Sequence, residues 1–122
     1  MDIMLSDEQR LLKDSVERFI ADEYSFEQRK RWVEEGADSS ANNWTTFAEL
    51  GWLALPLPEE HGGLGGSLSD VAVVMEGFGR GLVIEPYLAT VLLGAQIIAS
   101  AGSDAQKADI LPKVAEGQMK LA

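Results

Sequence analysis

The stretch Leu82–Ala101 contains a single charged side chain, Glu85. At about 20 residues, it has the length that a helix needs to cross a membrane. Pro86, Thr90 and Gln96 within it, and the lack of flanking Lys or Arg clusters, argue against a membrane span. A helix that is apolar all round then belongs at the centre of a helical bundle. We therefore expect residues 84–101 to form the most buried helix of the chain.

Composition limits the classes of function that the chain can serve. It has 122 residues, one histidine, no cysteine and a net charge of −10. This length predicts one domain over residues 1–122. The lack of cysteine excludes disulfides and thiolate metal sites, and a single histidine excludes a two-histidine zinc helix. The negative charge argues against nucleic-acid binding, which depends on Lys and Arg contacts to phosphates. The first ten residues lack the basic and apolar regions of a secretory signal, so we expect a cytoplasmic protein.

Capping residues and glycines mark the expected helix boundaries. The sequence Ser6-Asp7-Glu8-Gln9 is a capping box that predicts a helix to about Glu23. Ser25 caps a second helix, Phe26–Glu35, which Gly36 ends. A second capping box, Ser103-Asp104-Ala105-Gln106, opens the last helix, and we expect Pro112 to interrupt it.

Two further helices are expected, at Ala41–Leu50 and from Ser67 or Ser69 to Arg80. Apolar and aromatic residues recur at helical spacing, and no segment shows the sustained alternation of a strand. The predicted fold is therefore all-α, a bundle of five to six helices. The expected core residues include Met75 and the aromatic side chains of Phe19, Trp32, Trp44, Phe47, Trp52 and Phe78.

The segment 52–66 is expected to be an ordered loop, because it combines two prolines and several glycines with large apolar residues. Its glycines do not follow the spacing of a phosphate-binding loop, so we interpret them as turn residues. His61 has no partner at a recognisable spacing, and the sequon Asn43-Trp44-Thr45 falls inside a predicted helix. The residues alone therefore indicate no catalytic group, no metal site and no cofactor-binding motif. Two roles are open for Glu85: its charge could complement the helix dipole, or it could face a binding site.

Three separated motifs resemble the N-terminal helical domain of the acyl-CoA dehydrogenases. They lie at 50–66 (LGWLALPLPEEHGGLGG), at 76–80 (EGFGR) and at 101–117, where AGSDAQK is followed by LPK and Gly117. The start, Leu5–Gln9, is also similar to the start of that family. The segment 81–90 looks most like the small subunits of two-subunit bacterial enzymes such as pimeloyl-CoA dehydrogenase.

The resemblance implies a flavoenzyme that oxidises the Cα–Cβ bond of an acyl-CoA, with a glutamate as general base and FAD as hydride acceptor. In that family, the base and most flavin contacts lie in a central β domain and a C-terminal helical bundle. The 122 residues therefore look like one domain excised from a longer chain, so that FAD would be bound elsewhere. The resemblance also implies an electron-accepting protein partner and assembly with other dehydrogenase subunits.

The same resemblance assigns substrate-binding positions to the helix over 84–101. The positions that close the far end of the acyl pocket fall on Glu85, Pro86, Ala89 and Leu93. A small residue at Ala89 leaves room for a long or bulky acyl group, whereas a charge at Glu85 is unusual beside a plain fatty chain. Two alternatives remain open: a non-catalytic structural subunit of a heteromeric dehydrogenase, and a stand-alone helical binding module.

Overall fold

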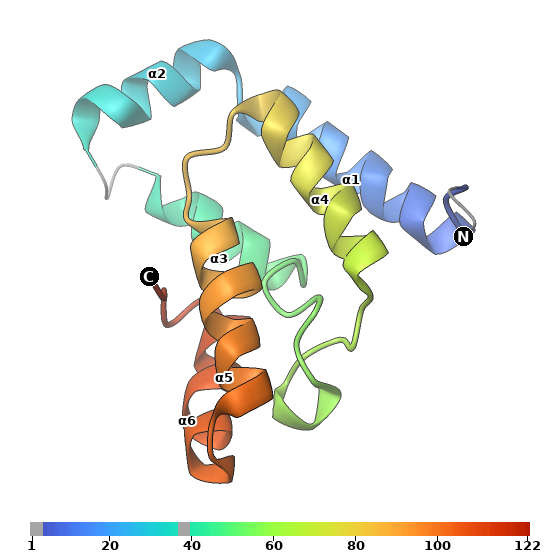
Figure 1. Cartoon of the computed structure of the whole chain (residues 1–122). Helices are drawn as coiled ribbons and strands as arrows, with labels where there is room; N and C mark the ends of the chain where they lie inside the picture. Colours follow the sequence, from blue (N-terminus) through green and yellow to red (C-terminus); the bar gives the residue numbers. More distant parts are fainter. Residues whose placement is uncertain (1–3, 37–39) are drawn as a thin grey trace. The chain divides into compact units, whose positions relative to one another are not determined.

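The computed structural model describes residues 4–36 and 40–122 (Figure 1). The described residues form six α-helices, a 3-10 turn (η1) and a π-helical segment (η2), and they include no strand. The all-α prediction is therefore confirmed. The chain divides into two compact units, residues 1–39 with 69–84 and residues 40–68 with 85–122, which we call the first and the second unit.

The first unit begins with α1, Asp7–Glu23, where the predicted capping box is confirmed. The Ser6 hydroxyl accepts from the Gln9 backbone N–H at 3.1 Å, and the Gln9 side-chain oxygen accepts from the Ser6 N–H at 3.0 Å. Helix α2, Phe26–Glu35, follows with its predicted cap at Ser25 and ends at Gly36, whose φ is 107°. Both helices thus begin and end where short local signals place them.

Helix α4, Leu68–Gly81, packs beside α1 and runs in the same direction (Figure 1). Near the helix starts, Gln9 Nε2 donates to Asp70 Oδ1 at 2.9 Å. Further along, the helices approach closely because α4 has a glycine where it meets the middle of α1. A Cβ atom added at Gly77 would lie 2.3 Å from Cγ1 of the fully buried Val16.

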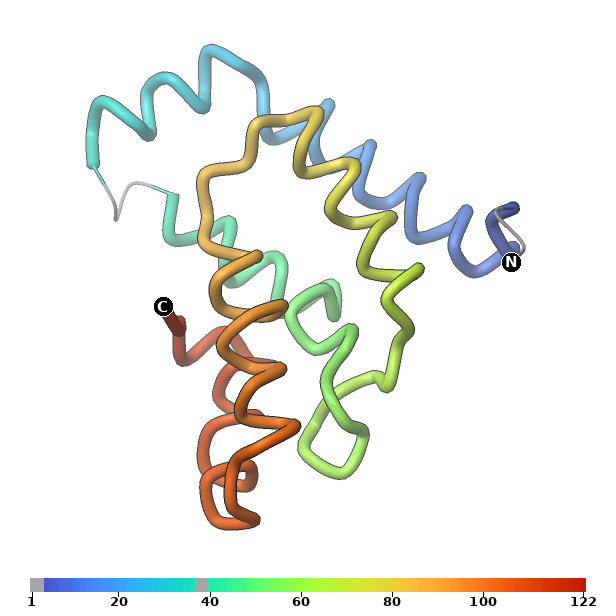
Figure 2. The backbone as a smooth tube through the Cα atoms, viewed as in Figure 1, coloured from blue at the N-terminus to red at the C-terminus, as the bar shows by residue number. Residues whose placement is uncertain are grey.

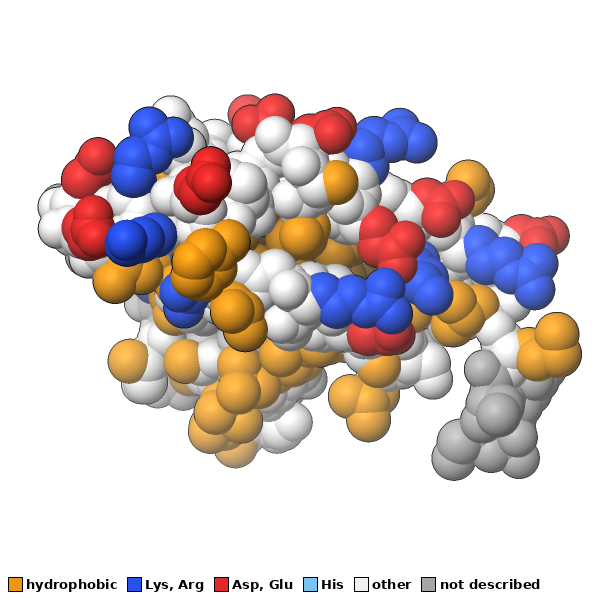
Figure 3. Space-filling model, turned by 90° about the horizontal axis from the view of Figure 1, so that it is seen from above, with side chains coloured by type: hydrophobic (Ala, Val, Ile, Leu, Met, Phe, Trp, Pro, Cys, Tyr) orange, Lys and Arg blue, Asp and Glu red, His pale blue; other side chains and the backbone are white. Residues whose placement is uncertain are grey.

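The aromatic residues predicted to form the core are buried. In the first unit the Phe19, Tyr24 and Trp32 rings contact in series, with centroids 6.2 and 4.8 Å apart. In the second unit the rings of Trp44, Phe47 and Trp52 form a similar series. Met75 is only partly buried. Acidic and basic side chains are interspersed on the face that Figure 3 shows.

The second unit begins with α3, Ala41–Glu49, and continues into the loop over 50–66. This loop folds back on itself (Figure 2), with Leu64 N–H donating to Ala54 O at 2.9 Å and Gly66 N–H to Leu55 O at 2.7 Å. Its tip holds η1, Glu59–His61, followed by Gly62 at a φ of 88°. The glycines therefore serve the turn, as predicted, and the loop is ordered through its own backbone hydrogen bonds.

The remaining elements of the second unit are η2, Leu88–Gly94, then α5, Ala95–Ala101, and α6, Asp104–Ala115. The α5 and α6 helices pack with the loop around a shared core of Ala54, Leu57, Ala95, Leu111, Val114 and Ala115. The capping box at Ser103 is confirmed. The predicted interruption at Pro112 is wrong, because α6 continues to Ala115. Burial of Leu111, Val114 and Ala115 stabilises the turn that the proline would otherwise weaken.

The prediction for residues 84–101 is wrong in two respects. The helical segment begins at Tyr87, because Leu82 has a left-handed φ of 52° and Glu85 precedes a proline, which disfavours helical backbone. It is also buried on one side only: Leu88, Leu93 and Ile97 are 51, 55 and 65% exposed. No helix among the described residues has the length and hydropathy to span a membrane.

Candidate functional site

An apolar stripe runs along the solvent side of η2 and α5. We define the stripe as Leu88, Ala89, Leu93 and Ile97, of which Ala89 is partly buried and the others are exposed. In a π-helix, residues four or five apart lie on one side, which groups Leu88 and Ala89 with Leu93. Thr90, Val91 and Ala95 on the other side are buried completely. Two of the four predicted substrate-binding residues, Ala89 and Leu93, therefore share one surface.

The other two predicted residues, Glu85 and Pro86, precede η2 rather than lying in its first turn. Pro86 is exposed, and its carbonyl accepts the Thr90 N–H at 3.0 Å. Glu85 is partly buried, and its Oε1 accepts from the side-chain Nδ2 of Asn43 at 2.9 Å. The carboxylate therefore joins the start of the stripe helix to α3 within the second unit.

The sequence around Asn43 indicates no role at the site, because the residue forms part of a glycosylation sequon there. Only 8% of Asn43 is exposed, and its amide is committed to Glu85. This burial agrees with the interpretation of the sequon as a chance match. No local pattern identifies the pair, because the two residues lie far apart in the sequence.

The backbone before η2 is fixed within the first unit by two side chains. Arg29 Nε donates to the Leu82 carbonyl at 2.6 Å, and the Ile84 N–H donates to the Tyr24 hydroxyl at 2.9 Å. The Arg29 contact helps to hold the left-handed backbone at Leu82, where a side chain is disfavoured.

Tyr87 anchors the start of the stripe helix in the second unit. Its side chain is 2% exposed, and its hydroxyl donates to the Trp52 carbonyl at 2.8 Å. Burial raises the pKa of the Tyr87 hydroxyl well above its usual range, because the phenolate would lose its hydration. Tyr87 is therefore a neutral hydrogen-bond donor with a structural role.

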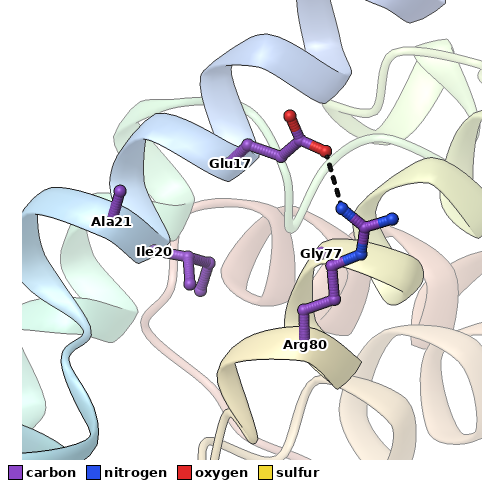
Figure 4. A pocket seen from close by; sticks show the side chains of 5 residues that line it. All are labelled: Glu17, Ile20, Ala21, Gly77 and Arg80. Atoms are coloured by element: carbon purple, nitrogen blue, oxygen red, sulfur yellow. Dashed lines mark hydrogen bonds and ion pairs between the residues drawn. The ribbon is translucent and has the colours of Figure 1, made fainter.

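A hollow lies within the first unit, between α1 and α4 (Figure 4). Its volume is about 260 Å³, and it is lined by Glu17, Ile20, Ala21, Gly77 and Arg80. Arg80 forms ion pairs with Glu17 at 3.2 Å and with Glu76 at 3.0 Å. The pair with Glu17 ties α4 to α1, whereas the pair with Glu76 lies within α4 and joins two residues of the 76–80 motif. We interpret this hollow as a packing feature, because ligand pockets usually span roughly 300–1,000 Å³.

The described residues contain no group of three His, Asp or Glu side chains that could hold a metal ion. His61 lies at the end of η1 in the glycine-rich loop. The stripe itself carries only apolar side chains, so it can contact a ligand but supplies no acid or base. The stripe can therefore form an apolar lining of a binding site, with no chemical role in a reaction.

Comparison with known proteins identifies what this architecture resembles. Residues 6–118 match the family model of the acyl-CoA dehydrogenase N-terminal domain. Acyl-CoA dehydrogenase IpdE2 of Mycolicibacterium smegmatis is 35% identical over 114 residues, which cover 93% of this chain and 35% of that protein. The chain thus spans about a third of the length of this curated relative.

Solved structures show the same fold. An acyl-CoA dehydrogenase of Bacillus anthracis complexed with FAD superposes with a TM-score of 0.84 at 27% identity, covering 96% of this chain and 20% of that one. The ChsE4–ChsE5 complex of Mycobacterium tuberculosis superposes with a TM-score of 0.76 at 26% identity, covering 98% of this chain and 30% of that one.

Proposed function

Because the chain belongs to the acyl-CoA dehydrogenase N-terminal domain family, we propose that it contributes one wall of the acyl pocket in an FAD-dependent dehydrogenase. The enzyme would oxidise the Cα–Cβ bond of an acyl-CoA thioester. The observation that carries this proposal is the stripe, an apolar surface on the helix to which the resemblance assigns the pocket. Its location in the sequence agrees with the assigned positions Ala89 and Leu93.

The hollow between α1 and α4 is too small for a flavin. The hollow between α1 and α4 holds about 260 Å³, and an isoalloxazine ring with its adenine dinucleotide is far larger. We propose that FAD, the general base and the contacts to an electron-accepting protein belong to parts of the enzyme outside residues 1–122. FAD would accept the hydride there, whereas this chain would exclude water and limit the length of the acyl group.

The stripe favours an acyl group of low polarity at its centre. Leu88, Leu93 and Ile97 offer only dispersion contacts and apolar area, which is worth about 25 cal/mol per Å² buried. The small Ala89 leaves space between them. Glu85 is hydrogen-bonded to Asn43, so we assign it to holding the wall rather than to contacting a polar acyl end.

Replacing Ala89 by Phe in the complete enzyme tests the wall. The ring would fill the space beside Leu93, and overpacking of this kind costs about 1–3 kcal/mol. We expect kcat/KM for the longest accepted acyl-CoA to fall roughly ten- to hundred-fold, with short substrates spared. The control is Ala108→Phe on the exposed side of α6, which should leave the chain-length profile unchanged. An unchanged profile for Ala89→Phe would reject the proposal.

A heteromeric dehydrogenase in which this chain is a non-catalytic subunit is a second candidate. The similarity to the ChsE4–ChsE5 complex favours it. In that case, a glutamate at the base position would be missing from the polypeptide that contains residues 1–122. Sequencing the whole gene and replacing any candidate glutamate by Gln distinguishes the two, because only a catalytic chain would lose turnover.

A further inference from the structure

The buried hydroxyl of Thr90 binds both backbone groups of one residue in the segment after α6. Thr90 is completely buried in η2. Its Oγ1 donates to the Leu121 carbonyl at 3.1 Å and accepts from the Leu121 N–H at 3.1 Å. All three groups belong to the second unit. The single Thr90 side chain therefore provides hydrogen-bond partners for both the N–H and the carbonyl of Leu121, which belongs to no helix.

Gly94 completes the contact, one π-helical turn further on. A Cβ atom added at Gly94 would lie 2.7 Å from Cβ of Leu121 and 3.0 Å from its Cδ1. The Leu121 side chain thus packs directly on the η2 backbone, at a position where only glycine fits without a shift. We call Thr90 and Gly94 together the Leu121 socket.

The hydrogen bonding of Thr90 is unusual for a threonine inside a helix. Such a hydroxyl commonly bonds the carbonyl four residues earlier, and β-branched residues gain little in helices. Here the carbonyl of Pro86 accepts the Thr90 backbone N–H, and the hydroxyl turns to Leu121. A valine of the same shape would be the ordinary residue in this apolar stretch. The hydroxyl of Thr90 therefore serves to bind the Leu121 backbone in the segment after α6.

The socket and the stripe alternate along the same π turn. Ala89 and Leu93 of the stripe lie about one turn apart, and so do Thr90 and Gly94 of the socket. Each stripe residue directly precedes a socket residue in the sequence. The socket side faces the interior, and the stripe side faces solvent. A displacement of Leu121 would therefore move the backbone that carries Ala89 and Leu93.

We propose that Thr90 is a positioning residue that fixes the acyl-pocket wall against the segment after α6, and thereby sets the acyl length that the enzyme accepts. This inference rests on the proposed function of the stripe. It adds that chain-length selectivity depends on a residue that never touches the substrate. It also gives Leu121 a part in setting chain-length selectivity.

Thr90→Val in the complete enzyme tests the inference, because it preserves shape and removes both hydrogen bonds. We expect the Leu121 amide proton to exchange roughly ten-fold faster, since its acceptor is lost. We expect KM for the longest accepted acyl-CoA to change about ten-fold, with kcat for short substrates retained. Thr90→Ser keeps the hydroxyl, so its Leu121 exchange rate and its KM for the longest acyl-CoA should equal those of the unchanged enzyme. The control Thr45→Val on the exposed side of α3 should alter neither.

The outcomes separate this inference from the function on which it rests. Faster exchange at Leu121 with an unchanged chain-length profile would overturn the inference, provided that Ala89→Phe shifts the profile. If Ala89→Phe also leaves the profile unchanged, the wall itself is refuted. Should Thr90→Val fail to fold, Thr90→Ala gives the same comparison, because it also removes both hydrogen bonds to Leu121 and places no methyl group where the hydroxyl was. An unshifted profile in that variant would overturn the inference.

Discussion

The side-chain amide of Asn43 donates a hydrogen bond to Oε1 of Glu85 across 2.9 Å. This bond joins α3 to the residues that precede η2, and it gives the only charged side chain of the stretch 82–101 a defined partner. Both residues are shielded from solvent, Asn43 almost completely. Hydrogen bonds to a charged group contribute about 1.5–3 kcal/mol, more than those between neutral groups.

Asn43→Asp is expected to destabilise the chain more than Asn43→Ala. The alanine removes the donor, whereas the aspartate also places a second carboxylate beside Glu85. We expect Asn43→Ala to lower the free energy of unfolding by about 1–3 kcal/mol in urea titrations at pH 7. The neighbouring Asn42 is exposed on the same helix, so Asn42→Asp serves as the control and should be nearly neutral. Equal stability of all three variants would show that the pair has no energetic role.

Two glycines of α4 are expected to respond to alanine with opposite signs. At Gly77 the new methyl group would meet Cγ1 of Val16 at 2.3 Å, whereas at Gly79 it would meet nothing within 4 Å. We expect Gly77→Ala to lower the free energy of unfolding by about 1–3 kcal/mol through overpacking. Gly79→Ala should raise it by about 0.5–1 kcal/mol, because alanine is the better helix former. Thermal unfolding of both variants checks the pair; a stabilising Gly77→Ala would contradict the close approach of α1 and α4.

Leu82→Gly is expected to stabilise the chain although it deletes a large side chain. Leu82 is 54% exposed and has a φ of 52°, a backbone that costs a residue with a Cβ atom roughly 1–2 kcal/mol. Glycine adopts it freely, but loses about 0.5–1 kcal/mol in backbone entropy. The expected net gain is up to about 1 kcal/mol in urea unfolding. Leu50→Gly is the control, because Leu50 is similarly exposed, at 47%, with a φ of −79°, and should lose stability.

Tyr87 is expected to make stability fall at high pH. Burial raises its pKa in the folded chain, so its contribution is complete below the unfolded pKa of about 10 and decreases as pH rises above that value. Tyr87→Phe removes the bond to the Trp52 carbonyl and should cost about 1 kcal/mol at pH 7. The phenylalanine cannot ionise, so its disadvantage should shrink in unfolding curves recorded above about pH 10. A difference that stays constant with pH would contradict this assignment.

For the stripe, the sequence pattern predicts the apolar helical segment but not which of its sides are buried. Low charge over 82–101 correctly indicates an apolar helical segment, and the resemblance places Ala89 and Leu93 on it. The prediction of complete burial is wrong, because composition counts apolar residues without saying how many sides of a helix find a partner. Here only the side of Thr90, Val91 and Ala95 is buried. The role of the opposite side as a pocket wall remains a proposal.

Local sequence sets the helix ends at Ser6, Ser25, Gly36 and Ser103, because a cap is complete within three or four residues and needs no distant partner. It also determined the all-α class and the turn at the glycine-rich loop. The contact of Asn43 with Glu85, the hydrogen bonds of Thr90 to Leu121 and the continuation of α6 through Pro112 depend on tertiary packing. These features depend on residues from separate elements, and their free energy arises only once those elements have packed together.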